Sequence, residues 1–313
     1  MGDLTIKGCS REGCQVLETG ICLVDVEFPK DCNNILNNDS SYKNKTEEYR
    51  AVEVGNVLSF ETIATILSDR KMPVVSIAGK AYSGKTTFIA VLFQRFMRQY
   101  RGFGGYQFVD SESFVALNQK YHYATAGSKT KAVGMPRSST HEDDYGYHFK
   151  TMGPDENFHE SIWLDLPGEL FDQRLSVNVE HWSMIPTLKR TTHTILFVDL
   201  EELNKPKKRD LYVNRCIDAL SHSVQSNVWK GRKLLVVFSK ADWYSEPARD
   251  FIDKTKKTIT RRVGKDFSSI DYCELHSLGE EKNIQHSLLE VWRWVHEDKP
   301  VIMGPLTRED VNE

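Results

Sequence analysis

The stretch GKAYSGKT, residues 79–86, decides the fold because it fits the pattern G-x-x-x-x-G-K-[ST]. It directly follows an apolar run at residues 74–78 and precedes an amphipathic helix, which is the context in which this pattern binds phosphate. Gly79 and Gly84 let the loop bend around phosphate oxygens, so that backbone N–H groups and the helix N-terminus face the anion. We therefore expect a phosphate-binding loop; the alternative is a glycine-rich turn that matches by chance.

The polar residues of this loop have expected roles in binding a nucleoside triphosphate. Lys85 would reach the β- and γ-phosphates, and the Thr86 hydroxyl would ligate Mg²⁺. The other predicted contacts of the nucleotide are Gly79, Tyr82, Ser83, Gly84 and Thr87. The sequence thus predicts a nucleotide and a magnesium ion in one site.

Apolar runs along the chain predict the strands of a sheet. They lie at residues 74–78, 162–164, 194–198, 234–238 and 272–275. Several are continuously apolar, which is typical of strands buried on both faces, and the segments between them are long enough for crossover helices. We therefore expect an α/β fold with a mostly parallel sheet and helices on both faces.

Length and charge exclude several classes of protein. A chain of 313 residues is enough for about two domains with a large core. With 41 basic and 44 acidic residues, the net charge of −3 does not favour DNA or an anionic membrane as the main partner. No window holds the roughly eighteen apolar residues of a membrane-spanning helix, and charges interrupt the first thirty residues, so we expect a cytoplasmic protein without membrane contact.

A second magnesium anchor is expected at the end of another strand. The run at 162–164 leads into the sequence DLPGE, which places Asp165 at a strand end. The Asp165 carboxylate would hold Mg²⁺ through water, and the Gly168 N–H would bond the γ-phosphate and so sense hydrolysis. The alternative, an ordinary strand-to-loop turn, is weakened by the phosphate loop at residues 79–86.

A base-recognition element is expected after the run at 234–238. The sequence SKAD at residues 239–242 is close to [NT]-K-x-D, in which the Asp accepts from guanine and the Lys stem packs on the purine. Lys240 and Asp242 are therefore the predicted guanine contacts, and Ser277 and Leu278 stand where a backbone N–H would bond the guanine carbonyl. Ser239 departs from the pattern, because a serine supplies only part of the bonding with which an asparagine braces this loop.

In this order, the four elements resemble the TRAFAC class of P-loop GTPases over about residues 73–296. The resemblance implies a Ras-like sheet, GTP or GDP as ligand, and Mg²⁺-dependent hydrolysis. Residues 57–100 look more particularly like bacterial stand-alone GTPases of the double-GTPase type. Relatives of that kind are often encoded in biological-conflict or phage-defence operons, which implies a protein partner such as an operon-encoded effector.

The resemblance also implies a switch threonine and groups that assist hydrolysis. Thr140 is the predicted switch residue, because it follows a proline-bounded loop and precedes a strand-like stretch at 145–150, expected beside 161–164; Thr130 is the second choice. Arg137 stands three residues before Thr140, the spacing of an arginine finger supplied in cis. Glu169 takes the position of a water-orienting glutamine, and a carboxylate there predicts slow hydrolysis.

Four cysteines, Cys9, Cys14, Cys22 and Cys32, lie near the start of the chain. They supply enough thiolates for a structural Zn²⁺ site, with free or regulatory thiols as the alternative. We assign residues 1–35 to this cysteine-rich module, 36–56 to a linker, 57–298 to the P-loop GTPase domain and 299–313 to a C-terminal tail.

The functional prediction is a GTP-binding and GTP-hydrolysing switch. The alternatives are a nucleotide-stabilised scaffold with little hydrolysis, and an ATPase. Basic residues are concentrated in the helix predicted at Lys254–Lys265. The ordinary explanation is a helix face exposed to solvent, and the functional alternative is a surface that binds an acidic partner or an RNA backbone.

Overall fold

The computed structural model describes residues 5–9, 35–38, 55–98, 102–129, 146–241, 249–276 and 281–297. The chain divides into two compact units, Met1–Arg50 and Ala51–Glu313. In the first unit, strand β1 (Thr5–Cys9) pairs antiparallel with β2 (Ile35–Asn38).

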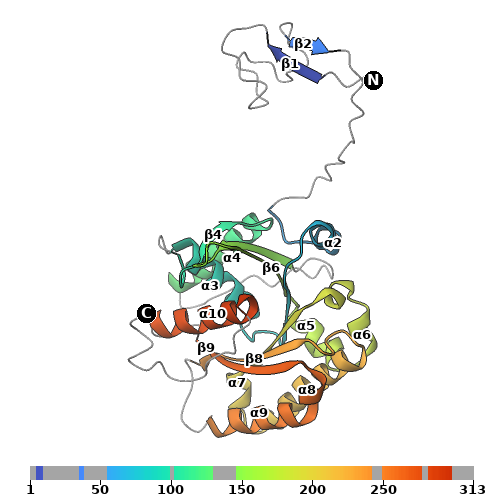
Figure 1. The fold of residues 1–313 in the computed structure, drawn as a ribbon. Coiled ribbons are helices and arrows are strands. Elements are labelled where there is room, and N and C mark those ends of the chain that lie inside the picture. Colours follow the sequence, from blue (N-terminus) through green and yellow to red (C-terminus); the bar gives the residue numbers. More distant parts are fainter. Residues whose placement is uncertain are drawn as a thin grey trace. The chain divides into compact units, whose positions relative to one another are not determined.

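The second unit is built on a seven-stranded sheet in the order β4-β5-β6-β3-β7-β8-β9 (Figure 1). The strands are β3 (Val74–Gly79), β4 (Gln107–Asp110), β5 (Gly146–Met152), β6 (Phe158–Asp165), β7 (His193–Asp199), β8 (Lys233–Ser239) and β9 (Ser269–Leu275). Strands β6, β3, β7, β8 and β9 are parallel to one another, while β5 pairs antiparallel with β6, and β4 pairs antiparallel with β5. The predicted α/β fold with a mostly parallel sheet is therefore confirmed.

Helices cover both faces of this sheet, because successive side chains of a strand point to opposite faces. Val75 and Ile77 of β3 belong to the core shared with α3, α4 and α10, whereas Val74 and Ala78 belong to the core shared with α2, α8 and α9. The helices are α2 (Phe60–Asp69), α3 (Lys85–Arg98), α4 (Phe114–Lys129), α5 (Gly168–Leu170), α6 (Glu180–Ser183), α7 (Leu200–Leu203), α8 (Arg209–Gln225), α9 (Arg249–Val263) and α10 (Glu281–His296), with shorter turns η2 (Phe171–Leu175), η3 (Pro186–Arg190) and η6 (Gly264–Asp266). Among the described helices, none has the length and apolarity to cross a bilayer.

No strand or helix was predicted from the sequence where the structure has strand β4 and helix α4. Tertiary packing explains both elements. The Phe93 ring of α3 lies 5.5 Å from Phe108 of β4, and 5.8 Å and 6.4 Å from Phe114 and Tyr121 of α4. In contrast, the predicted strand beside 161–164 is confirmed, because β5 pairs with β6 along its whole length.

The C-terminal end of α10 carries a histidine packed against the sheet. His296 Nε2 lies 3.1 Å from Ser161 Oγ, and its ring centroid lies 4.3 Å from that of Trp292 and 5.5 Å from that of His159. Burial lowers the pKa of His296 to about 3, and the neighbouring His159 and His193 add to that shift. The folded state therefore favours the neutral imidazole.

Replacing His296 with glutamine is expected to flatten the pH dependence of stability on the acidic side. A depressed histidine pKa contributes stability that is complete above about pH 6.5 and is lost as pH falls toward the folded-state value. Between pH 6.5 and 4.5 this loss amounts to about 2 kcal/mol in the wild-type chain and is absent from the variant. Urea unfolding at both pH values measures it.

A matched control on the same helix titrates in the opposite direction. Burial raises the pKa of Glu290 to about 7, so its contribution to stability is present below about pH 4.5 and is lost as pH rises through 7. The Glu290→Gln variant should therefore lose more stability on acidification than the wild type. An unchanged pH slope in the His296→Gln variant would contradict the assignment of a buried neutral imidazole.

Candidate nucleotide-binding site

The loop between β3 and α3 has the conformation that its glycines predict. Gly79 has φ +151° and Gly84 has φ +92°, both in the range that glycine tolerates. A Cβ on Gly79 would also lie 2.7 Å from the Phe197 carbonyl oxygen of β7, which leaves no room for a side chain. Tyr82 has φ +66° and is 73% exposed, while Ser83 is buried in the loop. Gly79, Tyr82, Ser83 and Gly84 thus form one tight turn at the carboxyl end of the central strand.

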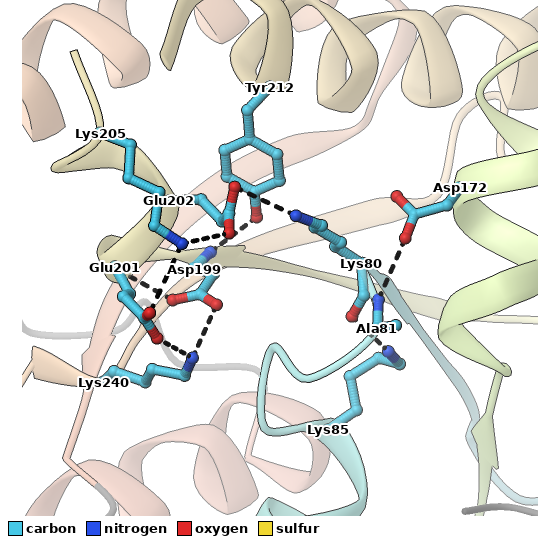
Figure 2. A network of polar contacts seen from close by, with 10 residues as sticks. All are labelled: Lys80, Ala81, Lys85, Asp172, Asp199, Glu201, Glu202, Lys205, Tyr212 and Lys240. Atoms are coloured by element: carbon cyan, nitrogen blue, oxygen red, sulfur yellow. Dashed lines mark hydrogen bonds and ion pairs between the residues drawn. The ribbon is translucent and has the colours of Figure 1, made fainter. Parts of the chain in front are cut away.

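The ammonium of Lys85 lies inside this loop (Figure 2). Its Nζ donates to the carbonyl oxygens of Gly79 at 2.8 Å and Lys80 at 3.0 Å. The residue is only 5% exposed, and burial lowers the pKa of Lys85, an effect that the Asp165 charge opposes. An ammonium at this position would attract an anion bound by the loop.

Asp165 lies beside the loop because β6 and β3 are parallel neighbours that pair Asp165 with Ile77. Thr86 Oγ1 donates to Asp165 Oδ2 at 2.5 Å, while the buried Oδ1 atom has no hydrogen-bond partner in the described part of the chain. Burial raises the pKa of Asp165, whereas the charge of Lys85 and the bond from Thr86 lower it. A carboxylate with a spare oxygen next to a threonine hydroxyl is the oxygen donor set that Mg²⁺ prefers, so these two residues fit a magnesium ion.

The turn after Asp165 lies directly on the phosphate loop. A Cβ on Gly168 would be 2.2 Å from Ala81 Cα and 2.3 Å from Ala81 N, so only glycine fits. Glu169 follows in α5 with an exposed side chain. Asp172 of η2 accepts a hydrogen bond from Ala81 N at 3.4 Å (Figure 2). Residues 168–172 are therefore held against the phosphate loop at Ala81.

The base-recognition element begins where β8 ends, beside the first turn of α3. A hollow there is lined by residues that include Gly84, Thr87, Ser239, Lys240 and His276. Lys240 has φ +62°, a conformation unusual for a residue with a side chain. Ser239 Oγ is buried and makes no hydrogen bond within the described residues. The hollow therefore lies between the phosphate loop at Gly84 and the predicted base contact Lys240.

The remaining predicted site residues lie outside the described residues and stay predictions. They are Arg137, Thr140 and its alternative Thr130, the base contacts Asp242, Ser277 and Leu278, and the thiols Cys14, Cys22 and Cys32. Cys9 is the last residue of β1, of which only the backbone is described. Across the described ranges, no group of three or more His, Cys, Asp or Glu side chains could hold a metal ion.

The structure places three further charged residues near the candidate site that the sequence did not indicate. Lys120 of α4 lies close enough to Asp165 for that charge to raise its pKa, although burial, the larger effect, lowers it. The other two charged residues are Asp172 and Asp199, which both take part in the polar contacts drawn in Figure 2. The rule that functional carboxylates follow parallel strands could have found Asp199 at the end of β7, but nothing in the local sequence singled out Lys120 or Asp172.

Comparisons with known proteins give the family of this chain. Among solved structures, the signal recognition particle receptor SRb-GTP/SRX complex from Chaetomium thermophilum is 13% identical with a TM-score of 0.41, covering 73% of this chain and 99% of that chain. The GTP-bound Ski7 GTPase-like domain of S. cerevisiae is 12% identical with a TM-score of 0.40, covering 75% of this chain and 52% of that chain. Bacterial selenocysteine-specific elongation factor EF-Sec is 14% identical with a TM-score of 0.38, and the match covers 74% of this chain but spans only 29% of that factor.

No curated protein sequence matches this chain significantly. The model of the Double-GTPase 2 family matches residues 73–294, which include the phosphate loop, Asp165 and Lys240. Because this match spans well over half of the chain, the protein belongs to the Double-GTPase 2 family of GTP-binding P-loop proteins.

Proposed function

We propose that this protein is a Mg²⁺-dependent GTPase that acts as a molecular switch. The observation that carries the proposal is the 2.5 Å contact between Thr86 Oγ1 and Asp165 Oδ2, beside the buried ammonium of Lys85. Phosphoryl transfer requires oxygen ligands for the metal and a cation for the phosphates, and segments that follow two adjacent strands supply both here. Membership of a GTP-binding family supports guanine as the base.

Different residues of the chain have different proposed roles in nucleotide binding and in hydrolysis. The N–H groups of the phosphate loop bind phosphate oxygens, and Lys85 neutralises charge on the β- and γ-phosphates. Thr86, Asp165 and Thr140 would hold Mg²⁺, which would neutralise the charge that develops when water attacks the γ-phosphorus and GDP leaves. Arg137 is the proposed second cation, and Lys240 with Asp242 selects guanine, assisted by the backbone of Ser277 and Leu278.

Loss of the γ-phosphate is the proposed switching event. Gly168 packs on Ala81 of the phosphate loop, so its N–H is well placed to bond the terminal phosphate. Release of that bond would free residues 168–175, and release of the metal would free the segment around Thr140. The surface presented to a protein partner would change accordingly.

Purified protein tests the proposal directly. We expect the nucleotide released on denaturation to be GDP or GTP. We also expect an excess of GTP, but not of ATP, to displace a fluorescent guanine nucleotide from the protein. Phosphate release should require Mg²⁺ and stop when the metal is chelated. Equal displacement by ATP would favour the ATPase alternative, and a chain that binds no purine nucleotide would refute the proposal.

A nucleotide-stabilised scaffold is the second candidate, and Glu169 favours it. An exposed carboxylate in this position accepts hydrogen bonds but does not donate them when ionised, and its charge repels the γ-phosphate. Tight nucleotide binding without phosphate release would identify the scaffold. The same sample can be assayed for zinc, which we propose is bound by Cys9, Cys14, Cys22 and Cys32.

The biological setting is proposed from the family resemblance. A stand-alone double-GTPase in a conflict or phage-defence system would work in the cytoplasm on an effector encoded nearby. An acidic partner could bind the exposed basic surface of α9 and the turn after it, which is formed by Lys254, Lys257, Arg261, Arg262 and Lys265.

A further inference from the structure

A short acidic turn follows strand β7 and faces the nucleotide site. We define the acidic turn as Asp199–Glu202, which includes Asp199 at the end of β7 and the start of α7. Asp199 is 3% exposed and held from two sides: its N–H donates to Tyr212 Oη at 2.7 Å, and its Oδ1 accepts from Glu201 N at 2.9 Å. The carboxylate therefore has one fixed orientation.

The ammonium of Lys240 is bound by this turn (Figure 2). Lys240 Nζ donates to Asp199 Oδ2 and to Glu201 Oε2, both at 2.8 Å. Burial lowers the pKa of Lys240, but the bonds to the two carboxylates raise it, and the net change is upward. The ammonium is thus charged and bound to the acidic turn, and Lys240 is also one of the residues that line the hollow.

The backbone of Lys240 and the preceding Ser239 explain why such a restraint matters. Its φ of +62° is a conformation that costs about 1 kcal/mol or more for a residue with a side chain. An asparagine at position 239 would brace the loop, but this chain has Ser239, whose hydroxyl makes no hydrogen bond in the described part of the molecule. The two carboxylate contacts of Lys240 take the place of that brace.

The acidic turn is also attached to the phosphate loop. Lys80 Nζ lies 3.0 Å from Glu202 Oε2, and Lys205 Nζ lies 2.8 Å from Glu202 Oε1 and 3.5 Å from Glu201 Oε1. Lys80 belongs to the loop that encloses the Lys85 ammonium. The turn therefore fixes the position of Lys240 relative to the phosphate loop rather than to β8 alone.

We infer that Asp199 and Glu201 are positioning residues for the guanine base, acting through Lys240, and that they replace the brace missing at Ser239. This inference rests on the proposed guanine-nucleotide site. A side chain that is already held in its bound geometry loses less freedom when the ligand arrives, so the preformed contacts raise affinity. Asp199 and Glu201 themselves need not touch the nucleotide.

A double-mutant cycle on GDP binding tests the inference. Asp199→Asn keeps the shape of the side chain and removes its charge, and Lys240→Met keeps the stem and removes the ammonium. We expect Asp199→Asn to weaken binding of a fluorescent GDP about tenfold, as loss of one charge-assisted hydrogen bond would. In the Lys240→Met background the same change should have almost no effect, because the partner is gone.

Two further variants keep the test decisive. Glu201→Gln alters a side chain that is 49% exposed, so the variant should fold, and it should weaken GDP binding about threefold. Asp210→Asn removes an exposed carboxylate from the first turn of α8 and should leave the affinity unchanged. Thermal unfolding of each nucleotide-free variant reports folding separately from binding.

The possible outcomes separate this inference from the proposed function. A merely structural Asp199 would lower GDP affinity equally in the wild-type and Lys240→Met backgrounds, and that additive result would overturn the inference alone. Unchanged affinity in both Asp199→Asn and Glu201→Gln would overturn it as well. A wild-type chain that binds no guanine nucleotide would instead refute the function on which the inference rests.

Discussion

Replacing Lys85 with methionine is expected to weaken GTP binding by at least about 100-fold, the equivalent of about 2.7 kcal/mol. The Lys85 ammonium is buried in the phosphate loop between two carbonyl oxygens, where solvent cannot replace it. Without it, the interior of the phosphate loop would offer the β- and γ-phosphates only neutral N–H groups. Titration with a fluorescent GTP analogue in the presence of Mg²⁺ measures the loss.

A second lysine in the same loop provides the matched control. The ammonium of Lys80 lies 3.0 Å from Glu202 and not inside the loop, so Lys80→Met should change GTP affinity by less than about fivefold. Equal losses in the two variants would show that the loop responds to its total charge. The role assigned to the buried Lys85 ammonium would then be wrong.

Replacing Gly168 with alanine is expected to disrupt both the fold near the loop and hydrolysis. The new methyl group would lie 2.2 Å from Ala81 Cα, so either the phosphate loop or residues 168–172 must move. Overpacking of this kind costs about 1–3 kcal/mol of unfolding free energy. Because the displaced backbone carries the N–H proposed to bond the γ-phosphate, we expect phosphate release to fall at least about tenfold.

Gly264 allows the same substitution without a clash. A Cβ there meets nothing nearer than 3.5 Å, so Gly264→Ala should change neither stability nor phosphate release by much. Urea unfolding and a single-turnover phosphate assay compare the two variants. A Gly168→Ala chain as stable and as active as the Gly264→Ala chain would show that Gly168 and Ala81 are not in contact in solution.

The central part of the fold could be predicted because its signals are local. Continuous apolar runs predict the buried parallel strands, and GKAYSGKT predicts the turn between β3 and α3. Strand β4 and helix α4 gave no comparable signal. The residues of β4 are largely exposed, and both elements depend on packing around Phe93, a contact between segments that the sequence does not place side by side.

The candidate site was predictable to the extent that its residues follow strands. Thr86 and Asp165 were expected to lie together because parallel neighbours bring their carboxyl ends to one edge, and the two side chains are in contact; their role as magnesium ligands stays a prediction. The contact of Asp172 with Ala81 and the nearness of Lys120 to Asp165 depend on where η2 and α4 pack, which no spacing rule gives. The bond between Asp199 and Lys240 joins residues 41 positions apart and became visible only in three dimensions.

The pairing of the central strand affects when the site can form as the chain folds. Strands β5 and β6 are joined by a short turn and can associate early, but Ile77 of β3 must pair with Asp165 and with Ile195, segments far along the chain. Such distant pairings are slow steps because a long loop must close before they form. The nucleotide site therefore arises only when the sheet is nearly complete, and bound nucleotide stabilises the finished domain against reopening. During synthesis, the phosphate loop is therefore made well before Lys240, which follows β8.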